Sequence, residues 1–245
     1  MTRCDSHPNL PLLLLPVTLL LLAGCSHNYR VEGSSTVTTL DGKTLYLRTL
    51  HDGEWVSVDS AEVVHGLFHM AGEVDSVVMA TLCMGDEGIM PLILERGKLT
   101  VTLSSTQLEA RGTPLNNALY DFIDRRTELA NSMEELERRE ARLVLEGKNF
   151  DEEHDQWVAE CESLAAEINT YVSDFITRNY DNILGPGVFM MVCSTLPYPV
   201  MTPEIQAIID SAPAAFRSNA FVKDYLSKAE ENMKLIREHQ LQSGN

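Results

Sequence analysis

The spacing of apolar residues changes near Gly112, and this change limits the fold classes open to the chain more than any other feature. Before Gly112, short apolar or alternating runs are separated by X-Gly pairs; after it, apolar residues recur every three or four positions almost to the end. Alternation indicates strands, and a period near 3.6 indicates helices. We therefore predict an α+β chain. An N-terminal antiparallel β-sandwich or small barrel covers residues 34–112, a C-terminal helical region covers 113–240, and 241–245 form a frayed tail.

Four X-Gly pairs carry the prediction of strands. They are Asp41-Gly42, Asp52-Gly53, His65-Gly66 and Arg96-Gly97. Each borders or separates short apolar runs, and such a pair is a strong hairpin signal because glycine adopts a positive φ without strain. Several runs at this regular spacing favour an antiparallel sandwich or a small barrel.

Two long helices are expected after the strands. Thr113-Pro114 supplies an N-cap residue and a proline at the first helical position. An apolar stripe then follows at positions 115, 119, 122, 126, 129, 133, 136, 140 and 143, where only Arg126 and Glu140 are not apolar. We expect this helix to end at Gly147 and a second to begin at Asp151, with the stripe Trp157, Cys161, Leu164, Ile168, Tyr171 and Phe175. The two predict a long antiparallel helical hairpin with a coiled-coil-like seam.

The remaining sequence predicts shorter helices. Gly185-Pro186-Gly187 is expected to break the chain before the apolar run at 188–193, and it lacks the Gly-Lys-Ser/Thr ending of a phosphate-binding loop. Thr202-Pro203-Glu204 is expected to begin a further helix. Ser218 or Asn219 begins a last one, whose inward residues are Phe221, Leu226, Ala229, Met233 and Ile236.

The N-terminus carries an apolar run over residues 10–22, which with Ala23 and Gly24 is shorter than the ~20 residues that cross a membrane as a helix. Residues 1–24 are therefore predicted to be a signal peptide. The sequence Leu22-Ala23-Gly24-Cys25 resembles the lipobox of bacterial lipoproteins, which implies that Cys25 carries the lipid and that the protein meets the membrane through it. Residues 25–33 would then be a lipidated tether. The alternative is a secretory signal followed by a chance cysteine.

The charge of the chain excludes one class of partner. The formal net charge is −17, and the cations are not clustered. Nucleic-acid binding needs clustered cations to displace phosphate counterions, so we expect no nucleic-acid partner. An acidic body is also repelled by anionic headgroups, so the lipid must supply the anchoring. Residues 26–30 hold no acidic cluster of the kind associated with surface export, which favours an outer-membrane location facing the periplasm.

The cysteines do not form a recognisable redox or metal motif. Beyond Cys25, the mature chain holds Cys83, Cys161 and Cys193, an odd number without short spacing. This is neither a disulfide framework nor a zinc site. A Cys161–Cys193 bridge remains open, and Cys83 and Cys193 lie in apolar runs where a thiol is usually buried and inert.

No catalytic, cofactor-binding or metal-binding residue is predicted. His65 and His69 would share one face of a helix, but Gly66 favours a strand or turn, and on a continuous strand they would lie ~13 Å apart. Asp59-Ser60 has no identifiable base, so we expect the aspartate to bond the backbone instead. Acidic and Arg residues interleave on the first long helix, which is typical of a solvated, salt-bridged face.

Six short motifs in the first half are informative through their order along the chain. They are 29–33 (Tyr-Arg-Val-Glu-Gly), 41–47 (Asp-Gly-Lys-Thr-Leu-Tyr-Leu), 58–61 (Val-Asp-Ser-Ala), 66–72 (Gly-Leu-Phe-His-Met-Ala-Gly), 94–97 (Leu-Glu-Arg-Gly) and 112–116 (Gly-Thr-Pro-Leu-Asn). Over roughly residues 29–130 the chain resembles a β-rich domain of unknown function. In many envelope lipoproteins that domain precedes a thioredoxin-like disulfide oxidoreductase domain. The helical part also resembles the connector of those proteins, at 182–185 and 202–205.

The chain departs from these relatives in one respect that bears on function. It contains no Cys-X-X-Cys pair, which a dithiol exchanger needs. We therefore expect a membrane-anchored, non-catalytic binding module of the cell envelope with a partner protein there. One alternative is an accessory partner of a separate thioredoxin-like oxidoreductase, and another is an enzyme whose site is assembled from distant residues.

Overall fold

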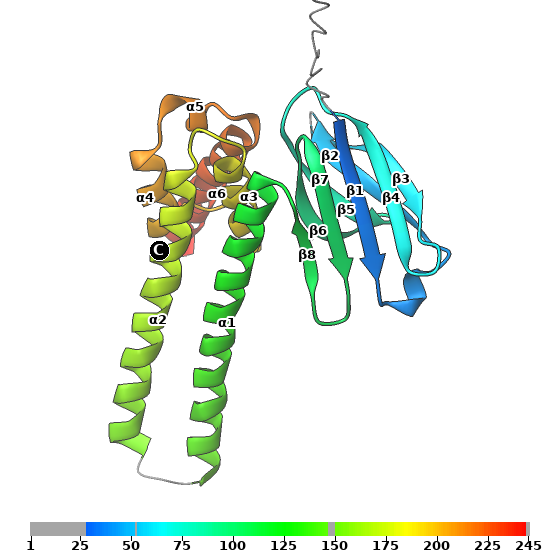
Figure 1. Cartoon of the computed structure of the whole chain (residues 1–245). Helices are drawn as coiled ribbons and strands as arrows, with labels where there is room; N and C mark the ends of the chain where they lie inside the picture. The colour runs from blue at the N-terminus through cyan, green and yellow to red at the C-terminus, as the bar shows by residue number, and fades with distance from the viewer. Residues whose placement is uncertain (1–27, 52, 147–149, 244–245) are drawn as a thin grey trace, which may run out of the picture.

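The computed structural model describes residues 28–51, 53–146 and 150–243, in which eight strands precede six α-helices (Figure 1). The strands are β1 (Asn28–Ser35), β2 (Thr44–His51), β3 (Glu54–Glu62), β4 (Leu67–Glu73), β5 (Val78–Met84), β6 (Glu87–Leu94), β7 (Gly97–Leu103) and β8 (Leu108–Arg111), with a 3₁₀ turn at Thr38–Leu40. The helices are α1 (Pro114–Glu146), α2 (Phe150–Arg178), α3 (Leu184–Cys193), α4 (Pro203–Ser211), α5 (Ala214–Arg217) and α6 (Ala220–Ser243). The predicted α+β architecture is confirmed.

The strands form two four-stranded sheets that pack face to face. Sheet A has the order β4-β1-β7-β8 and sheet B the order β3-β2-β5-β6. Most neighbours are antiparallel, but β1 and β7 pair in parallel, with Val31 opposite Leu99. The prediction of a wholly antiparallel sandwich is therefore wrong for sheet A. The physical reason is that a parallel pair needs a long crossover, and here the chain between β1 and β7 builds all of sheet B on the way.

The core lies between the sheets and follows the alternation of the strands. Leu45, Leu47, Leu82 and Leu92 of sheet B are fully buried against Val31, Phe68, Val101 and Leu103 of sheet A. Gly33 lets the Phe68 ring lie across β1, because a Cβ at Gly33 would come within 2.0 Å of that ring. The aromatic ring thus fills the space that the glycine leaves in the sheet.

The X-Gly pairs end strands as predicted, but they connect them in different ways. Strands β2 and β3, which lie on either side of Asp52-Gly53, pair as a hairpin, and Asp52 itself lies outside the described residues. His65-Gly66 and Arg96-Gly97 instead link strands that belong to different sheets. The β5–β6 hairpin turns at Gly85, which the sequence interpretation did not single out.

The helical hairpin is confirmed. Helices α1 and α2 lie side by side over their length (Figure 1), and the Trp157 indole Nε1–H donates to the Leu136 carbonyl at 2.9 Å across the seam. Phe122 and Phe175 also pack together there, with ring centroids 4.4 Å apart and the ring planes tilted by 37°. The later helices begin where predicted: Thr202 accepts a hydrogen bond from the Ile205 N–H at the start of α4, and Asn219 caps α6.

Three predicted boundaries are wrong. Strand β1 starts at Asn28, so residues 28–33 of the predicted tether are part of the sheet, where Tyr29 and Val31 are buried. Gly185-Pro186-Gly187 does not break the chain but lies in the first turn of α3. The N–H groups of a first helical turn have no partner within the helix, so a proline, which has no N–H, costs no hydrogen bond there. Helix α6 continues to Ser243, so the tail predicted from 241 is helical over its described part. Among the described residues, no helix is long and apolar enough to cross a membrane.

Candidate functional site

The histidines that the sequence analysis considered as metal ligands lie in a turn and a strand. His65 has a φ of 52° in the turn before β4, and His69 lies within β4. Within residues 28–51, 53–146 and 150–243, no group of three or more His, Cys, Asp or Glu side chains is arranged to hold a metal ion. These positions therefore offer no preformed metal centre in the described part of the chain.

Asp59 holds β3 in place. Its Oδ1 accepts the Ser60 backbone N–H at 2.7 Å, which confirms the predicted bond between this side chain and the backbone. Its Oδ2 accepts the Tyr29 hydroxyl at 2.8 Å, so the carboxylate joins β3 to β1 across the sandwich. Burial, reinforced by this hydrogen bond, raises the pKa of Tyr29 well above its usual value. The pair is a structural tie between the two sheets.

The three cysteines of the described chain are free thiols, so the Cys161–Cys193 bridge that the sequence left open is not formed. Cys83 and Cys193 are buried, as predicted. Burial raises the pKa of Cys83 and brings that of Cys193 to about 11. Burial and the nearby Glu140 and Glu137 raise the pKa of Cys161. Because the thiolate is the nucleophile, none of these three thiols is activated for exchange.

The charged face of the hairpin is solvated and salt-bridged, as predicted. Arg125 pairs with Glu167 at 2.9 Å, and Arg142 with Glu135 at 2.9 Å. Arg139 also pairs with Glu160. Their carboxylates are exposed partners of arginines, and exposed pairs contribute little to stability. The charges of this face are thus largely paired with one another.

One side of the sandwich is closed by the first turns of α1. The Asn116 side chain is fully buried beside β6, where it makes the pair of hydrogen bonds that the backbone of a neighbouring strand would make. Its Oδ1 accepts the Ile93 N–H at 2.8 Å, and its Nδ2 donates to the Ile93 carbonyl at 2.7 Å. Glu95 then caps α1, because its Oε1 accepts the backbone N–H groups of Leu115 at 2.9 Å and Asn116 at 3.2 Å. The backbone groups of Ile93 that point away from β5 are thereby paired.

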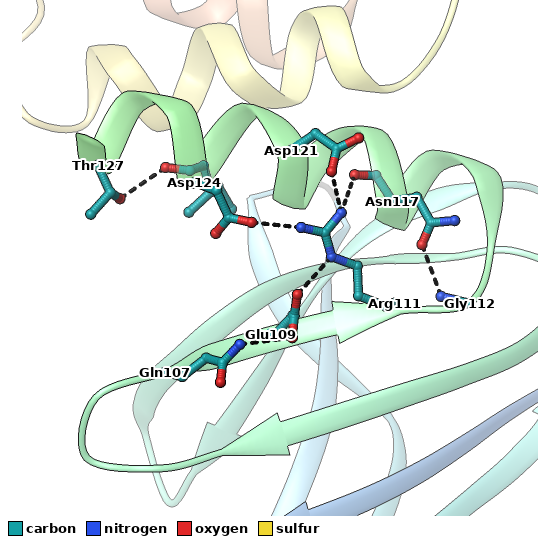
Figure 2. Close-up of polar contacts among 9 residues, drawn as sticks. Gln107, Glu109, Arg111, Gly112, Asn117, Asp121, Asp124 and Thr127 are labelled. Atoms are coloured by element: carbon teal, nitrogen blue, oxygen red, sulfur yellow. Dashed lines mark hydrogen bonds and ion pairs between the residues drawn. The ribbon is translucent and has the colours of Figure 1, made fainter. Parts of the chain in front are cut away.

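Arg111, the last residue of β8, closes the neighbouring edge of sheet A (Figure 2). Its Nε donates to Glu109 Oε1 at 2.8 Å, and its Nη2 donates to Asp124 Oδ2 at 2.6 Å. Its Nη1 donates to the Asn117 carbonyl at 2.9 Å and to Asp121. All of its nitrogens are thus engaged by the protein itself. The cluster fastens β8 to α1, and its guanidinium is not available to an anionic ligand.

A groove of about 570 Å³ lies beyond this cluster, between the β7–β8 turn and α1. It is lined by Ser104, Ser105, Thr106, Gln107, Leu108, Ile123, Asp124, Thr127, Glu128 and Asn131. Much of the polar lining already serves the protein. The Ser104 Oγ accepts the N–H groups of Thr106 and Gln107, at 3.3 and 2.8 Å, and the Thr127 hydroxyl donates to the Ile123 carbonyl. The groove therefore presents few free polar groups that converge on a ligand.

The opposite side of the sandwich is open. Strand β3 is the edge of sheet B and β4 is the edge of sheet A, and both lie on the flank away from α1 (Figure 1). In the described part of the chain, β3 pairs only with β2, and β4 pairs with β1, apart from a bridge in which Leu67 and Val64 exchange backbone hydrogen bonds of 2.9 and 3.0 Å. Half of the backbone N–H and C=O groups of an edge strand point outward, so beyond this bridge they face solvent.

A groove of about 490 Å³ follows these two open edges. It is lined by Ser60, Ala61, Glu62, Val64, Leu67, Phe68 and His69. Val64 and Leu67 are each 53% exposed, although both are large and apolar. An apolar groove beside free strand edges has the chemistry to bind an extended polypeptide. This groove, here called the open-edge groove, is the candidate functional site.

The residues that distinguish the two sides were not found by the sequence analysis. Asn116 and Arg111 were passed over because a polar residue beside an apolar stripe gives no signal of burial. The turn around His65-Gly66 was recognised, but nothing local shows that its flanking strands become two free edges. Cys25, the predicted lipid attachment site, lies outside the described residues.

Comparison with known proteins agrees with part of the resemblance. Residues 29–119 match the family described as a domain of unknown function (DUF4369). The match runs from β1 to the first turns of α1 and so includes Asn116. No curated protein matches the chain.

Proposed function

We propose that this protein is a lipid-anchored, non-catalytic binding module of the cell envelope, which binds an extended segment of a partner protein in the open-edge groove. The main support for the proposal is the difference between the strand edges on the two sides of the sandwich. On one side, Asn116 pairs with the Ile93 backbone of β6, and the Arg111 side chain fastens β8 to α1. On the other side, no helix covers β3 and β4, and of their outward backbone groups those of Leu67 pair with Val64. The rest of these two edges is left available for pairing with another strand.

The chemistry of the groove favours an extended, partly aliphatic segment. Outward N–H and C=O groups of an edge strand pair best with another extended backbone, and alternate side chains then enter the groove. Val64 and Leu67 supply apolar contacts for those side chains, while Glu62 lies at the rim and favours a basic neighbour. Affinity would come mainly from the backbone and specificity from these side chains.

A second copy of this chain is a poor occupant. If two β3 strands paired antiparallel about Val58, each Glu54 would face a Glu62 of the other copy, and like charges directly opposite each other are destabilising. The net charge of −17 adds a general repulsion between copies. The partner is therefore a different protein, which the anchor would hold at the same membrane.

The anchor is proposed to be lipid on Cys25, in the outer membrane and facing the periplasm. Two or more acyl chains give stable anchoring, whereas one gives only marginal binding. Alanine at Cys25 is expected to abolish labelling by a fatty-acid probe and to release the protein from the membrane fraction. Unchanged labelling or membrane association in that variant contradicts the anchor.

The groove is tested by site-specific photo-crosslinking in the intact envelope. A photoreactive residue at Val64 should give a defined adduct with a partner protein, whereas one at Leu108, which is 42% exposed on the sealed side, should not. Adding Leu67→Asp should remove the adduct at position 64. The control pairs the probe at 64 with Asn131→Asp on the sealed side, which should keep the adduct. Adducts at both probe positions, or at neither, contradict the groove as the binding site.

A further inference from the structure

The anchor-bearing end of the sandwich also carries the tip of the β2–β3 hairpin. The Tyr29 hydroxyl contacts Asp59 at 2.8 Å, and the Ser35 N–H donates to the Gly66 carbonyl at 2.7 Å. Strands β1 and β3 are therefore close at both ends and run in the same direction. The start of β1 and the β2–β3 turn consequently lie at one end of the sandwich (Figure 1).

The length of chain before β1 fixes how far this end can be from a lipid on Cys25. Only two residues, Ser26 and His27, separate Cys25 from Asn28, the first residue of β1. The three residue-to-residue steps from Cys25 to Asn28 span at most about 11 Å when fully extended. A lipidated Cys25 therefore holds the Asn28 end of the sandwich close to the bilayer surface.

The hairpin tip extends in the same direction by a similar distance. Trp55 lies opposite Leu50 and Asp59 opposite Leu47, because β3 has a bulge at Val58, so three strand steps of about 10 Å in total separate their levels. Continuing the β2–β5 pairing, in which Thr49 lies opposite Ala80, places the β4–β5 loop with Val77 at the level of this tip. The tip can thus reach the surface that the anchor reaches.

Four large apolar side chains at this end face solvent. Trp55 is 56% exposed, Val56 and Val77 are 45% exposed, and Val58 is 44% exposed. We call these four residues the tip patch. Strand β2 pairs with β5 as far as Thr49, and beyond that residue β2 and β3 continue as a two-stranded ribbon in the described chain.

We propose that the tip patch contacts the bilayer that carries the anchor, with the Trp55 indole in the headgroup region. This rests on the lipid anchor proposed above. Tryptophan favours the membrane–water interface because its ring is apolar and its N–H is polar. Glu54 and Glu73 flank the patch and disfavour anionic headgroups, so the surface that fits is a zwitterionic lipid.

Two points of contact would fix the orientation of the molecule. The anchor and the tip patch lie at one end, while the open-edge groove lies toward the other end of β3, around Glu62 and Leu67. The tip of the α1–α2 hairpin also points away from the end where β1 begins (Figure 1). The groove and the hairpin would then both face away from the lipid.

The two tryptophans of the chain provide the test and its control. Trp157→Phe leaves Trp55 as the only tryptophan, and Trp55→Phe leaves Trp157, which is half-buried in the helical hairpin. The lipidated full-length mature protein is placed in phosphatidylcholine vesicles with and without brominated acyl chains. Trp55 emission should be lost in the brominated vesicles, whereas Trp157 emission should stay unchanged. Trp55 is exposed, so Trp55→Phe should keep the unfolding midpoint of the parent protein. Trp157→Phe loses the hydrogen bond to the Leu136 carbonyl and should unfold at a somewhat lower midpoint, while remaining folded under the conditions of the vesicle experiment.

The outcomes separate this proposal from the anchor on which it rests. If the protein floats with the vesicles but Trp55 is not quenched, the tip patch is wrong and the anchor stands. If the protein does not float, both are wrong. Equal quenching of Trp55 and Trp157 contradicts a defined orientation. A photoreactive residue at position 55 that gives adducts with protein instead of lipid would make the tip a protein interface and overturn the lipid contact.

Discussion

The two sides of the β-sandwich end their sheets in opposite ways. On the sealed side, α1 covers β6 and β8, buried Asn116 pairs with the β6 backbone, and the Arg111 cluster fastens β8 to the helix. On the open side, β3 and β4 have exposed apolar side chains, and the Tyr29–Asp59 hydrogen bond ties β3 to β1. Free edges invite pairing with other chains, and proteins usually block them. The sealed side therefore serves stability, and the open side is free for the binding proposed above.

The largest effect is expected at Asn116. Alanine there leaves the Ile93 N–H and carbonyl buried without partners, which should lower the free energy of unfolding by about 3 kcal/mol. Urea denaturation of the non-lipidated chain measures this change in the free energy of unfolding. Asn117→Ala is the matched control, since it loses only the exposed bond from the Gly112 N–H. Equal losses in the two variants would mean that Asn116 does not seal the edge.

Arg111→Met should have the next largest effect. It leaves Glu109, Asp121 and Asp124 close together without their shared cation, so we expect a loss of about 1–2 kcal/mol that shrinks in high salt. The control is Arg138→Met on the exposed hairpin face, which should change the free energy of unfolding very little. Faster hydrogen exchange in β8 and the start of α1 should accompany the loss. An effect no larger than that of Arg138→Met contradicts the clamp.

Tyr29→Phe tests the tie on the open side. Loss of the hydroxyl leaves Asp59 Oδ2 without its partner and should cost about 1 kcal/mol. The folded protein also keeps this phenol protonated at a pH where the unfolded chain ionises it, so the folded state binds more protons. Stability should therefore fall as pH rises above about 10. Urea midpoints measured from pH 8 to 11 should fall less steeply in the variant than in the parent. Identical slopes would contradict the raised pKa.

The smallest effect on stability is expected in the open-edge groove. Leu67→Ser should change the free energy of unfolding by no more than about 0.5 kcal/mol, because Leu67 is 53% exposed. The same change at Leu119, which is fully buried in α1, should cost several times more. Thermal unfolding of both variants measures the contrast. A large loss at Leu67 would show that the groove is part of the core and would break the comparison.

The helices and strands were predictable because each produces its own spacing of apolar residues within its own segment of the sequence. The stripe from Leu115 to Leu136 gave α1, and the N-cap signals at Thr113, Thr202 and Asn219 gave three helix starts. Apolar alternation and the X-Gly pairs gave most of the strands. Such signals are contained within a few residues, so one sequence is enough to find them.

The arrangement of the strands was not predictable in the same way. The parallel pairing of β1 with β7 joins segments almost 70 residues apart, and no local pattern encodes it. Strand β1 was assigned to the tether because it directly follows the predicted anchor. Asn116 could be recognised only once α1 was seen to lie against β6. The candidate site could not be predicted from the sequence for the same reason, because a strand edge is free only if no other strand lies beside it in the fold.

Helix α1 belongs to both halves of the molecule. Its first turns complete the β domain, and its remaining turns form the hairpin with α2. At 33 residues and 1.5 Å per residue, it is a continuous rod of about 50 Å whose base is fixed to the sandwich at Asn116 and Arg111. A displacement at the far end of the hairpin is therefore transmitted as a torque on β6 and β8. The sandwich and the helical hairpin are therefore joined through one continuous helix that is fixed at its base.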